Sequence, residues 1–353
     1  MTHQPTISVL MSVYNQAAFV MEALSSILDQ DFVDFELLVV DDGSTDDTVE
    51  ILIDTQSNDD RLQIFTNPTN IGLTRSLNFA LTKASGQFIA RMDADDICFP
   101  DRFSKQVYEF ENNSDLMICG SNAVFLDETS SVEYPSNLPV TDQEIRCFFL
   151  LGNPFVHSSV MLRLDRLRQS GLKYDLSYRT AQDYELWSRV INYGSCKNIK
   201  TELITCRKHH NSISHLDKVQ QITDQIRVRN TFISRLPKDN NTKATLYEAG
   251  KNTNLNSDIY TDEKQAAECH LRTAISLYLT NPALSSDYNM THILGQYVKA
   301  TVTTPKQLLN ITRLVWPLIS FRSLRLLMIH TTTRVLHSFR IGGFAAIRLS
   351  IFS

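Results

Sequence analysis

Short apolar runs alternate with helix-periodic segments along the first hundred residues of the chain. The runs have the length and apolar content of buried strands, and they cover residues 7–13, 35–40, 61–66 and 87–91. Between them, apolar residues recur every three or four positions, which predicts helices near residues 19–28, 47–55 and 73–84. Strands that alternate with helices at this spacing predict an α/β fold, with a mostly parallel sheet and helices on both faces.

Beyond residue 100 the pattern of apolar positions is more mixed. Pro100 predicts the first turn of a helix, and Thr141 with Glu144 has the spacing of a capping box. Residues 158–163 are strand-like, and residues 183–193 have helical spacing. This part of the chain is therefore expected to extend the α/β fold with both strands and helices.

The strand pattern fades after residue 215. We therefore divide the chain into an α/β domain over residues 1–215 and a mainly helical C-terminal region over residues 216–353. Residues 238–258 are polar and rich in Asn and Thr, which predicts a linker or loop.

The composition is that of a soluble globular protein. Hydrophobic residues make up 42% of the 353 residues, and charged residues make up 21%. No apolar run is long enough to span a bilayer, and the N-terminus lacks the basic region of a signal peptide. The six cysteines are scattered without C-x-x-C spacing, which indicates reduced thiols. We expect a cytoplasmic protein.

The net charge of −5 conceals an uneven distribution. From Tyr288 to the C-terminus the chain has eight Lys or Arg residues and no Asp or Glu, so the rest has a net charge of −13. Within this basic tail, Leu324, Leu327 and Met328 share one helical face. An amphipathic basic segment predicts peripheral attachment to an anionic membrane surface, here on its cytoplasmic face. A helical subdomain with solvated arginines is the alternative. No nucleic-acid-binding module is recognisable, and we expect no nucleic acid partner.

Two acidic clusters follow predicted strands. Asp93 and Asp95 come just after the strand at 87–91, and carboxylate oxygens of this kind suit Mg²⁺ or Mn²⁺. Such a cation neutralises the charge of a departing diphosphate. Asp41 and Asp42 end the second strand, where acidic residues of nucleotide-binding folds contact the base or ribose. Either cluster is alternatively a solvated turn, and the second can instead cap the next helix.

Three further residues are candidates for chemistry. Tyr14 follows the first strand and offers an aromatic face for a base. Asp183 lies at or beside a helix start, whose positive potential would keep a general base ionised. His209 follows a strand and offers a metal ligand or a phosphate contact. Simple packing of Tyr14, helix capping by Asp183 and solvation of His209 are the alternatives.

Taken in order, these motifs resemble those of the family 2 glycosyltransferases with the Rossmann-like GT-A fold, of the bacterial surface-polysaccharide type. The resemblance covers about residues 7–214. Its motifs are ISVLMSVYN at 7–15, VVDDGS at 39–44, IARMDADD with its D-x-D element at 89–96, NPFVHS at 153–158, QDYELW at 182–187 and R-x-H-x-x-S-I-S at 207–214. Each motif alone is weak, but six in register are specific. One departure is Cys206, where the family often has Tyr.

The resemblance implies a role for each motif. A nucleotide-sugar half, about residues 1–100, would contact the nucleotide through Ser12, Tyr14, Asp41, Asp42, Arg91 and Asp93. Mn²⁺ or Mg²⁺ would be held by Asp93, Asp95 and His209. An acceptor half, about residues 101–215, would place Asn153, His157 and Trp187 beside the acceptor. Asp183 would be the catalytic base.

The implied reaction is metal-dependent transfer of a sugar, with inversion, from a nucleoside diphosphate sugar to an acceptor hydroxyl. By family habit the donor is a UDP-sugar and the acceptor a glycan or lipid-linked glycan. A non-catalytic sugar-nucleotide-binding scaffold at the membrane is one alternative, but it should lack the metal pair or the base. A nucleotidyltransferase is another, but residues 12–18 lack the Gly-rich, basic loop that binds a triphosphate.

Overall fold

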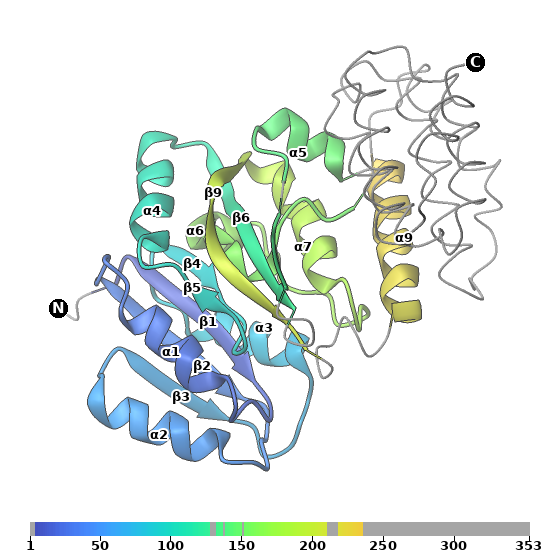
Figure 1. The fold of residues 1–353 in the computed structure, drawn as a ribbon. Helices are drawn as coiled ribbons and strands as arrows, with labels where there is room; N and C mark the ends of the chain where they lie inside the picture. Colours follow the sequence, from blue (N-terminus) through green and yellow to red (C-terminus); the bar gives the residue numbers. More distant parts are fainter. Residues whose placement is uncertain (1–3, 128–131, 137, 150–151, 210–217, 236–353) are drawn as a thin grey trace, which may run out of the picture. The chain divides into compact units, whose positions relative to one another are not determined.

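The computed structural model describes residues 4–127, 132–136, 138–149, 152–209 and 218–235 (Figure 1). The chain divides into two units, residues 1–235 and 236–353, and all described residues belong to the first. The predicted linker at 238–258 and the basic tail from residue 288 lie outside the described residues, as do residues 212–214 of the last motif. The domain boundary near residue 215 stays a prediction.

The first half of the described unit is a parallel sheet. Its strands are β1 (Ile7–Val13), β2 (Phe35–Asp41), β3 (Leu62–Thr66) and β4 (Phe88–Arg91), in the order β3-β2-β1-β4 (Figure 1). They are connected by α1 (Val20–Leu28), α2 (Thr48–Asn58) and α3 (Leu73–Lys83). The chain moves outward from β1 to β3 and then returns to the other side of β1. Right-handed crossovers therefore place α1 and α2 on one face and α3 on the other.

This topology explains the sequence pattern. Strand β1 is covered on both faces, so it is an almost continuous apolar run in which Ile7, Val9 and Met11 are fully buried. Helix α1 instead buries one face, formed by Val20, Ala23, Leu24 and Ile27. The chain reverses its direction across the sheet between β1 and β4, and ligands of open α/β sheets bind outside the carboxyl ends of the strands at such a point.

The second half extends the same sheet with strands of mixed direction. They are β5 (Ile97–Cys98), β6 (Leu116–Asp127), β7 (Val132–Pro135), β8 (Met161–Arg163) and β9 (Ser195–Lys208). The order continues β4-β8-β6-β9-β5, with β7 paired to β6. Strand β8 is antiparallel to β4 and β6, whereas β9 is parallel to β6. The helices of this half are α4 (Arg102–Asn112), α5 (Asp142–Phe148), α6 (Leu164–Gln169), α7 (Gln182–Val190) and α9 (Lys218–Arg235).

The predicted elements of the first half are confirmed to within a few residues. The capping box before α5 is also confirmed: Glu144 Oε2 accepts from the Val140 and Thr141 amides at 3.0 Å, and the Glu144 amide lies 3.4 Å from Thr141 Oγ1. The helix predicted at 183–193 is α7 followed by a short 3₁₀ helix, Ile191–Tyr193.

Two predictions of local structure are wrong. The segment at 158–163 is not one strand, because His157–Ser159 forms a 3₁₀ turn before β8. The Ser159 hydroxyl donates to the Val156 carbonyl, and the Ser158 hydroxyl bonds to carboxylates that follow β4. Such side-chain bonds compete with the hydrogen bonds of a strand ladder. The helix expected to open at Pro100 begins at Arg102 instead. The Phe99 amide donates to the Leu203 carbonyl of β9, and the Phe99 carbonyl accepts from the Arg102 amide, so Pro100 lies in a turn that precedes the helix.

Candidate active site

Three carboxylates gather where β4 ends. Asp93, Asp95 and Asp96 each offer an oxygen, and these oxygens lie within 4.8 Å of one another. The side chains of Asp93 and Asp95 are 33% and 20% exposed, whereas Asp96 is buried. This acidic cluster therefore presents two carboxylates to solvent and holds a third behind them.

One buried arginine and one serine hold the acidic cluster together. Arg91, the last residue of β4, is buried, and its guanidinium pairs with Asp93 and donates to Ser158 Oγ at 3.0 Å. The Ser158 hydroxyl has one proton to offer to Asp93 Oδ2, 3.0 Å away, or to Asp96 Oδ2. The turn that carries Ser158 is thereby tied to the end of β4.

The three carboxylates differ in their readiness to ionise. Burial opposes ionisation of Asp93, but the charge and hydrogen bonds of Arg91 hold its pKa below the usual value. Burial and the neighbouring charge of Asp93 raise the pKa of Asp95. Burial, with the charges of Asp93 and Asp95, raises the pKa of Asp96 to about 8. The acidic cluster thus offers three hard oxygen donors beside a single arginine, and a divalent cation fits this donor set.

The end of β9 reaches the same cluster. His209 Nε2 lies 2.9 Å from Asp95 Oδ2, and the His209 ring stacks on Phe19 with 4.9 Å between centroids. The Arg207 amide donates to Asp96 Oδ1 at 3.0 Å. The structure therefore brings His209 to Asp95 as the metal-site prediction requires, through a hydrogen bond between the two side chains.

Asp183 lies at the start of α7, within the field of the same arginine. Asn153 Nδ2 donates to Asp183 Oδ2 at 2.7 Å and so orients the carboxylate. The helix N-terminus was expected to keep Asp183 ionised, but burial outweighs it and raises the pKa. The charge of Arg91 acts on both Asp93 and Asp183 and lowers the pKa of each.

Two of the predicted acceptor-side residues belong to an aromatic group below this site. His157 Nε2 bonds to the Tyr174 hydroxyl at 2.9 Å, and burial lowers the pKa of His157 well below its usual range. Trp187 packs edge-on against both rings and is fully buried. Trp187 therefore has a packing role in this structure, and its predicted contact with an acceptor stays a prediction.

On the nucleotide side, Tyr14 is exposed, whereas Asp41 is buried but has a carboxylate oxygen without a hydrogen-bond partner among the described residues. Tyr14 is 42% exposed just beyond β1, and Ser12 near the end of that strand is partly exposed. Asp41 Oδ1 accepts from the Ser44 amide at 3.1 Å. Asp41 Oδ2 is buried and has no hydrogen-bond partner among the described residues. A buried carboxylate oxygen in that state is costly unless a ligand donates to it.

The adjacent Asp42 is occupied within the protein. Its Oδ1 accepts from Asn67 Nδ2, the Ile71 amide and Ser76 Oγ at 2.8–3.0 Å, and its Oδ2 accepts from the Gly72 amide at 2.8 Å. The residue is 2% exposed. Asp42 therefore holds the loop before α3, and the structure offers it no free oxygen for a base or ribose.

Two residues that contact the acidic cluster or belong to it were not predicted from the sequence. Asp96 stands in the D-x-D region, and Ser158 in the NPFVHS motif, but neither was predicted to be a site residue. Ser158 lies far from Asp93 in the sequence, so only the fold shows their contact.

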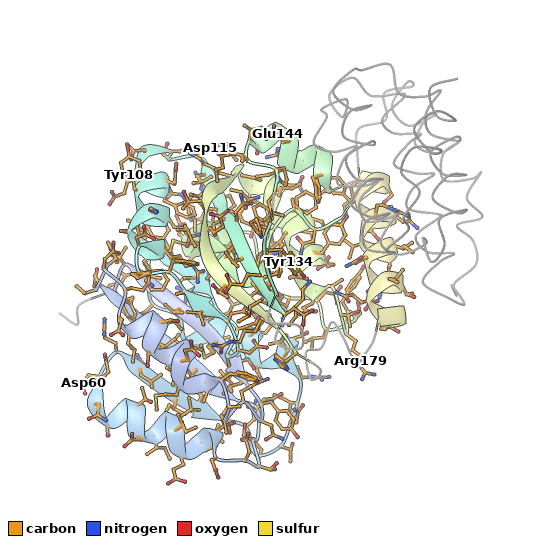
Figure 2. The ribbon with its side chains drawn as sticks, viewed as in Figure 1. Asp60, Tyr108, Asp115, Tyr134, Glu144 and Arg179 are labelled. Carbon is orange, nitrogen blue, oxygen red and sulfur yellow. The ribbon has the colours of Figure 1, made fainter. Side chains whose placement is uncertain are left out.

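Other polar side chains lie away from this cluster: Asp60, Tyr108 and Asp115, for example, are at the outer edge of the domain (Figure 2).

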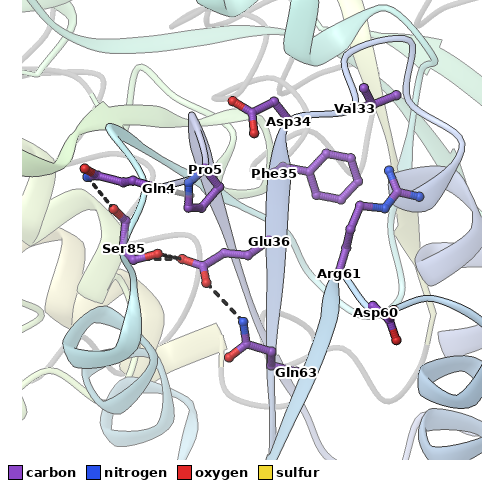
Figure 3. Close-up of a pocket in the computed structure, with 10 residues that line it drawn as sticks. All are labelled: Gln4, Pro5, Val33, Asp34, Phe35, Glu36, Asp60, Arg61, Gln63 and Ser85. Atoms are coloured by element: carbon purple, nitrogen blue, oxygen red, sulfur yellow. Dashed lines mark hydrogen bonds between the residues drawn. The ribbon is translucent and has the colours of Figure 1, made fainter. Parts of the chain in front are cut away.

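A hollow at the amino ends of β2 and β3 has a different character (Figure 3). Glu36 accepts from Ser85 Oγ at 2.8 Å and from Gln63 Nε2 at 3.1 Å. The Arg61 guanidinium covers the Phe35 ring at 4.4 Å. Several polar side chains of this hollow are thus hydrogen-bonded to one another, and none of its described lining residues has a buried polar atom without a partner.

Known proteins resemble this chain in sequence and in fold. The model of glycosyl transferase family 2 matches residues 8–171. An uncharacterized glycosyltransferase of Haemophilus influenzae is 31% identical over 229 residues, which is 63% of this chain and 71% of that protein. The amylovoran biosynthesis glycosyltransferase AmsE of Erwinia amylovora is 31% identical over 53% of this chain and 70% of its own length.

Two solved structures share the fold at low sequence identity. TarS 1-349 of S. aureus, solved with UDP-GlcNAc, has a TM-score of 0.54 at 17% identity and covers 95% of this chain and 91% of its own. The mannosyltransferase PcManGT of Pyrobaculum calidifontis, solved with GDP-Man and Mn²⁺, has a TM-score of 0.54 at 15% identity and covers 95% and 88%.

The mixed, mostly parallel sheet and its relatives define a glycosyltransferase with the GT-A fold. Within that class, this chain belongs to glycosyltransferase family 2. Both the fold and the enzyme class predicted from the sequence are thereby confirmed.

Proposed function

We propose that this glycosyltransferase transfers a sugar from a UDP-sugar to a hydroxyl of a glycan or lipid-linked acceptor during cell-surface polysaccharide biosynthesis. Two comparisons support the proposal. AmsE acts in amylovoran biosynthesis, and TarS was solved with UDP-GlcNAc. The observation that carries it is the acidic cluster of Asp93, Asp95 and Asp96 just beyond β4, together with the charge of Arg91, which acts on both Asp93 and Asp183.

The donor is held from two sides in this proposal. Asp41 Oδ2, which is buried and has no partner in the part of the chain that the structure describes, accepts a donor group of the base or ribose, and the exposed Tyr14 ring stacks on the base. Ser12 lines the same end of β1. Asp93 and Asp95 would hold Mn²⁺ or Mg²⁺, with His209 beside Asp95. When bound, the cation neutralises the charge that develops on the departing nucleoside diphosphate.

The acceptor reacts from the other side. Asp183, oriented by Asn153, takes the proton of the acceptor hydroxyl as its oxygen attacks the anomeric carbon. The hydroxyl oxygen forms the new bond as the bond to the diphosphate breaks, so a single displacement inverts the anomeric configuration. Burial raises the pKa of Asp183, which makes its carboxylate a better proton acceptor near neutral pH.

The substitution Asp183→Asn tests this assignment. The side chain keeps its shape and can still bond Asn153, but it cannot accept the proton. We expect transfer to fall by about 10²- to 10⁴-fold, while UDP binding measured by calorimetry stays within about twofold. Asp60→Asn, an exposed acid at the outer edge of the domain, serves as the matched control with near-normal transfer. Transfer by Asp183→Asn close to that of the wild type would remove the base assignment.

The donor is tested by thermal stabilisation with a panel of UDP-, GDP- and dTDP-sugars in the presence of Mn²⁺. A ligand that binds only the folded protein raises its melting temperature, and at a fixed ligand concentration the rise increases with the logarithm of the affinity. We expect the largest rise with UDP-sugars and a much smaller rise in Asp41→Ala. A larger rise with GDP-sugars would contradict the assignment of the base.

A further inference from the structure

Helix α9 lies beyond the segment that the family model matches, yet it contacts the loop that presents Asp183. It follows His209 in the chain, and it packs against α7. Phe232 of α9 lies 5.4 Å from the Phe149 ring, which stacks on Tyr184 of α7 at 5.7 Å. Two consecutive turns of α9 then reach the loop at residues 175–181.

The backbone before α7 has an unusual conformation. Ala181, which caps the helix, has φ of 52° and lies in the left-handed region. This region disfavours residues with a side chain, so surrounding contacts must hold the turn. The turn sets the direction in which α7 starts and thus where Asp183, two residues on, points.

A buried carboxylate of α9 supplies those contacts. Asp224 is 3% exposed, and its Oδ2 accepts from the Thr180 amide at 3.1 Å and from Thr180 Oγ1 at 2.7 Å. Its Oδ1 accepts from Gln220 Nε2 at 3.1 Å. Both oxygens are therefore committed, and one of them bonds twice to the residue beside Ala181.

The next turn of α9 fixes the loop a few residues earlier. The Arg227 guanidinium lies 4.2 Å from the centre of the Tyr178 ring, and it donates to the Ser177 carbonyl at 3.3 Å. The loop thus has contacts with α9 at residues 177, 178 and 180. Asp224 makes the contact nearest to the base.

We propose that Asp224 is a positioning residue for the catalytic base: it holds the turn at Thr180 and Ala181 so that Asp183 faces the acceptor hydroxyl. The inference rests on the proposed function of Asp183. Without the Asp224 carboxylate, the turn loses two hydrogen bonds and relaxes from the left-handed conformation, and Asp183 moves. A displacement of about 1 Å at a reacting group can cost on the order of 100-fold in rate.

The experiment measures initial transfer rates of the full chain for Asp224→Ala, well below its melting temperature. We expect kcat to fall by about 10- to 100-fold, with KM for the donor within about twofold. Asp224→Asn keeps an oxygen that can accept from Thr180, and we expect its kcat to recover to within about threefold of the wild type. Thr180→Val removes only the hydroxyl bond and should lower kcat by about three- to tenfold, which keeps the test available if Asp224→Ala does not fold.

Two comparisons separate positioning from general damage. Phe232→Leu removes packing from the same helix and should lower the melting temperature without changing kcat. In the Asp183→Asn background, Asp224→Ala should cause no further loss, because the base it positions is already gone. A further loss of the same factor in that background would show a general structural effect and overturn the proposal.

The outcomes also distinguish this inference from the proposed function. If Asp183→Asn is inactive while Asp224→Ala has normal kcat, the base assignment stands and the positioning role of Asp224 is wrong. If Asp183→Asn transfers normally, the base assignment is wrong and the positioning role falls with it.

Discussion

Two carboxylates of this site have opposite surroundings at the scale of single residues. Asp93 pairs with Arg91, whose charge lowers its pKa against the effect of burial. Asp183 is dominated by burial, which raises its pKa, and its side-chain hydrogen bond comes from the neutral Asn153. Environments that push the pKa values of two acids apart are typical of sites in which the acids have different roles. Here the lowered pKa of Asp93 suits a carboxylate that stays ionised to bind a cation, and the raised pKa of Asp183 suits a proton acceptor.

The raised pKa of Asp183 predicts the pH dependence of stability. The folded state binds this proton more tightly than the unfolded state, whose Asp pKa is about 3.9. The stability from this group is therefore complete below that pH and is lost as the pH rises through the folded-state pKa. We expect Asp183→Asn to raise the melting temperature at pH 7 but not near pH 3.

A control of opposite sign is available at Asp59. Its hydrogen bonds with Arg61, at 3.0 Å and 2.6 Å, lower its pKa. This group adds stability above the unfolded pKa and loses it as the pH falls through the folded pKa. Asp59→Asn should therefore lower the melting temperature at pH 7. A lower melting temperature for Asp183→Asn at pH 7 would contradict the predicted sign.

Neighbouring residues show how far the sequence alone identifies the site. Asp41 and Asp42 are equivalent by position and charge, and both were predicted to contact the nucleotide. The structure separates them, because Asp42 bonds the loop before α3 while one Asp41 oxygen has no partner among the residues that the structure describes. Trp187 likewise follows Asp183 on the same helix but is buried beneath His157. Such distinctions depend on which loops cross above a strand end, which periodicity does not encode.

At the scale of elements, the turn after β2 joins two loops at the nucleotide side. Gly43 has φ of 78°, and a Cβ there would lie 2.7 Å from the Thr69 carbonyl carbon and 2.9 Å from the Asn70 amide nitrogen. Neither backbone atom can move without displacing the loop that Asp42 holds. The glycine therefore allows this loop to pass close to the end of β2.

We expect Gly43→Ala to lower the free energy of unfolding by about 2–4 kcal/mol in urea denaturation, because strain and a backbone clash add. Gly171→Ala is the matched control, since Gly171 also has a positive φ of 64° but open space around its Cβ position. That substitution should cost only about 1 kcal/mol of strain. Equal losses in the two variants would show that the clash does not form.

The elements themselves were predictable where a period dominates. Strands β1 to β4 and helices α1 to α3 follow regular apolar patterns, and their predicted bounds agree with the structure. Strand β6 was not recognised, because Gly120, Ser121 and Asn122 interrupt its apolar run. The sheet accommodates them through contacts with other segments. Asn122 Nδ2 donates to the Lys200 carbonyl, and Gly120 leaves room for the Asn198 side chain, which a Cβ there would meet. Both contacts are tertiary.

At the largest scale that the structure describes, the proposed site draws on two halves of one sheet. The first half supplies Arg91, Asp93 and Asp95, and the second supplies Asp183 and His209. The antiparallel pairing of β4 with β8 brings the second half beside the acidic cluster. The residues of the site are thus far apart in the sequence, and their convergence was implied by the family resemblance rather than by any local pattern.

The basic tail from residue 288 predicts that the enzyme binds an anionic membrane surface, where a lipid-linked acceptor would be found. Among the described residues, no helix is long and apolar enough to cross a bilayer. Eight Lys or Arg residues without acids would attract the tail to anionic lipid on the cytoplasmic face of a membrane. We expect the full chain to sediment with anionic liposomes at low salt and to be released at high salt, because salt screens the attraction. Arg322→Glu with Arg325→Glu should weaken binding, and no sedimentation at low salt would contradict the prediction.

The most direct test of the account is a calorimetric titration of UDP with and without Mn²⁺. If Asp93 and Asp95 hold a cation against the diphosphate, Mn²⁺ should tighten UDP binding to the wild type by about 10-fold or more. Asp95→Ala should lose this increase, and Asp183→Asn should keep it. An Asp95→Ala variant that still shows the full effect of Mn²⁺ would contradict a cation-bound diphosphate at this acidic cluster.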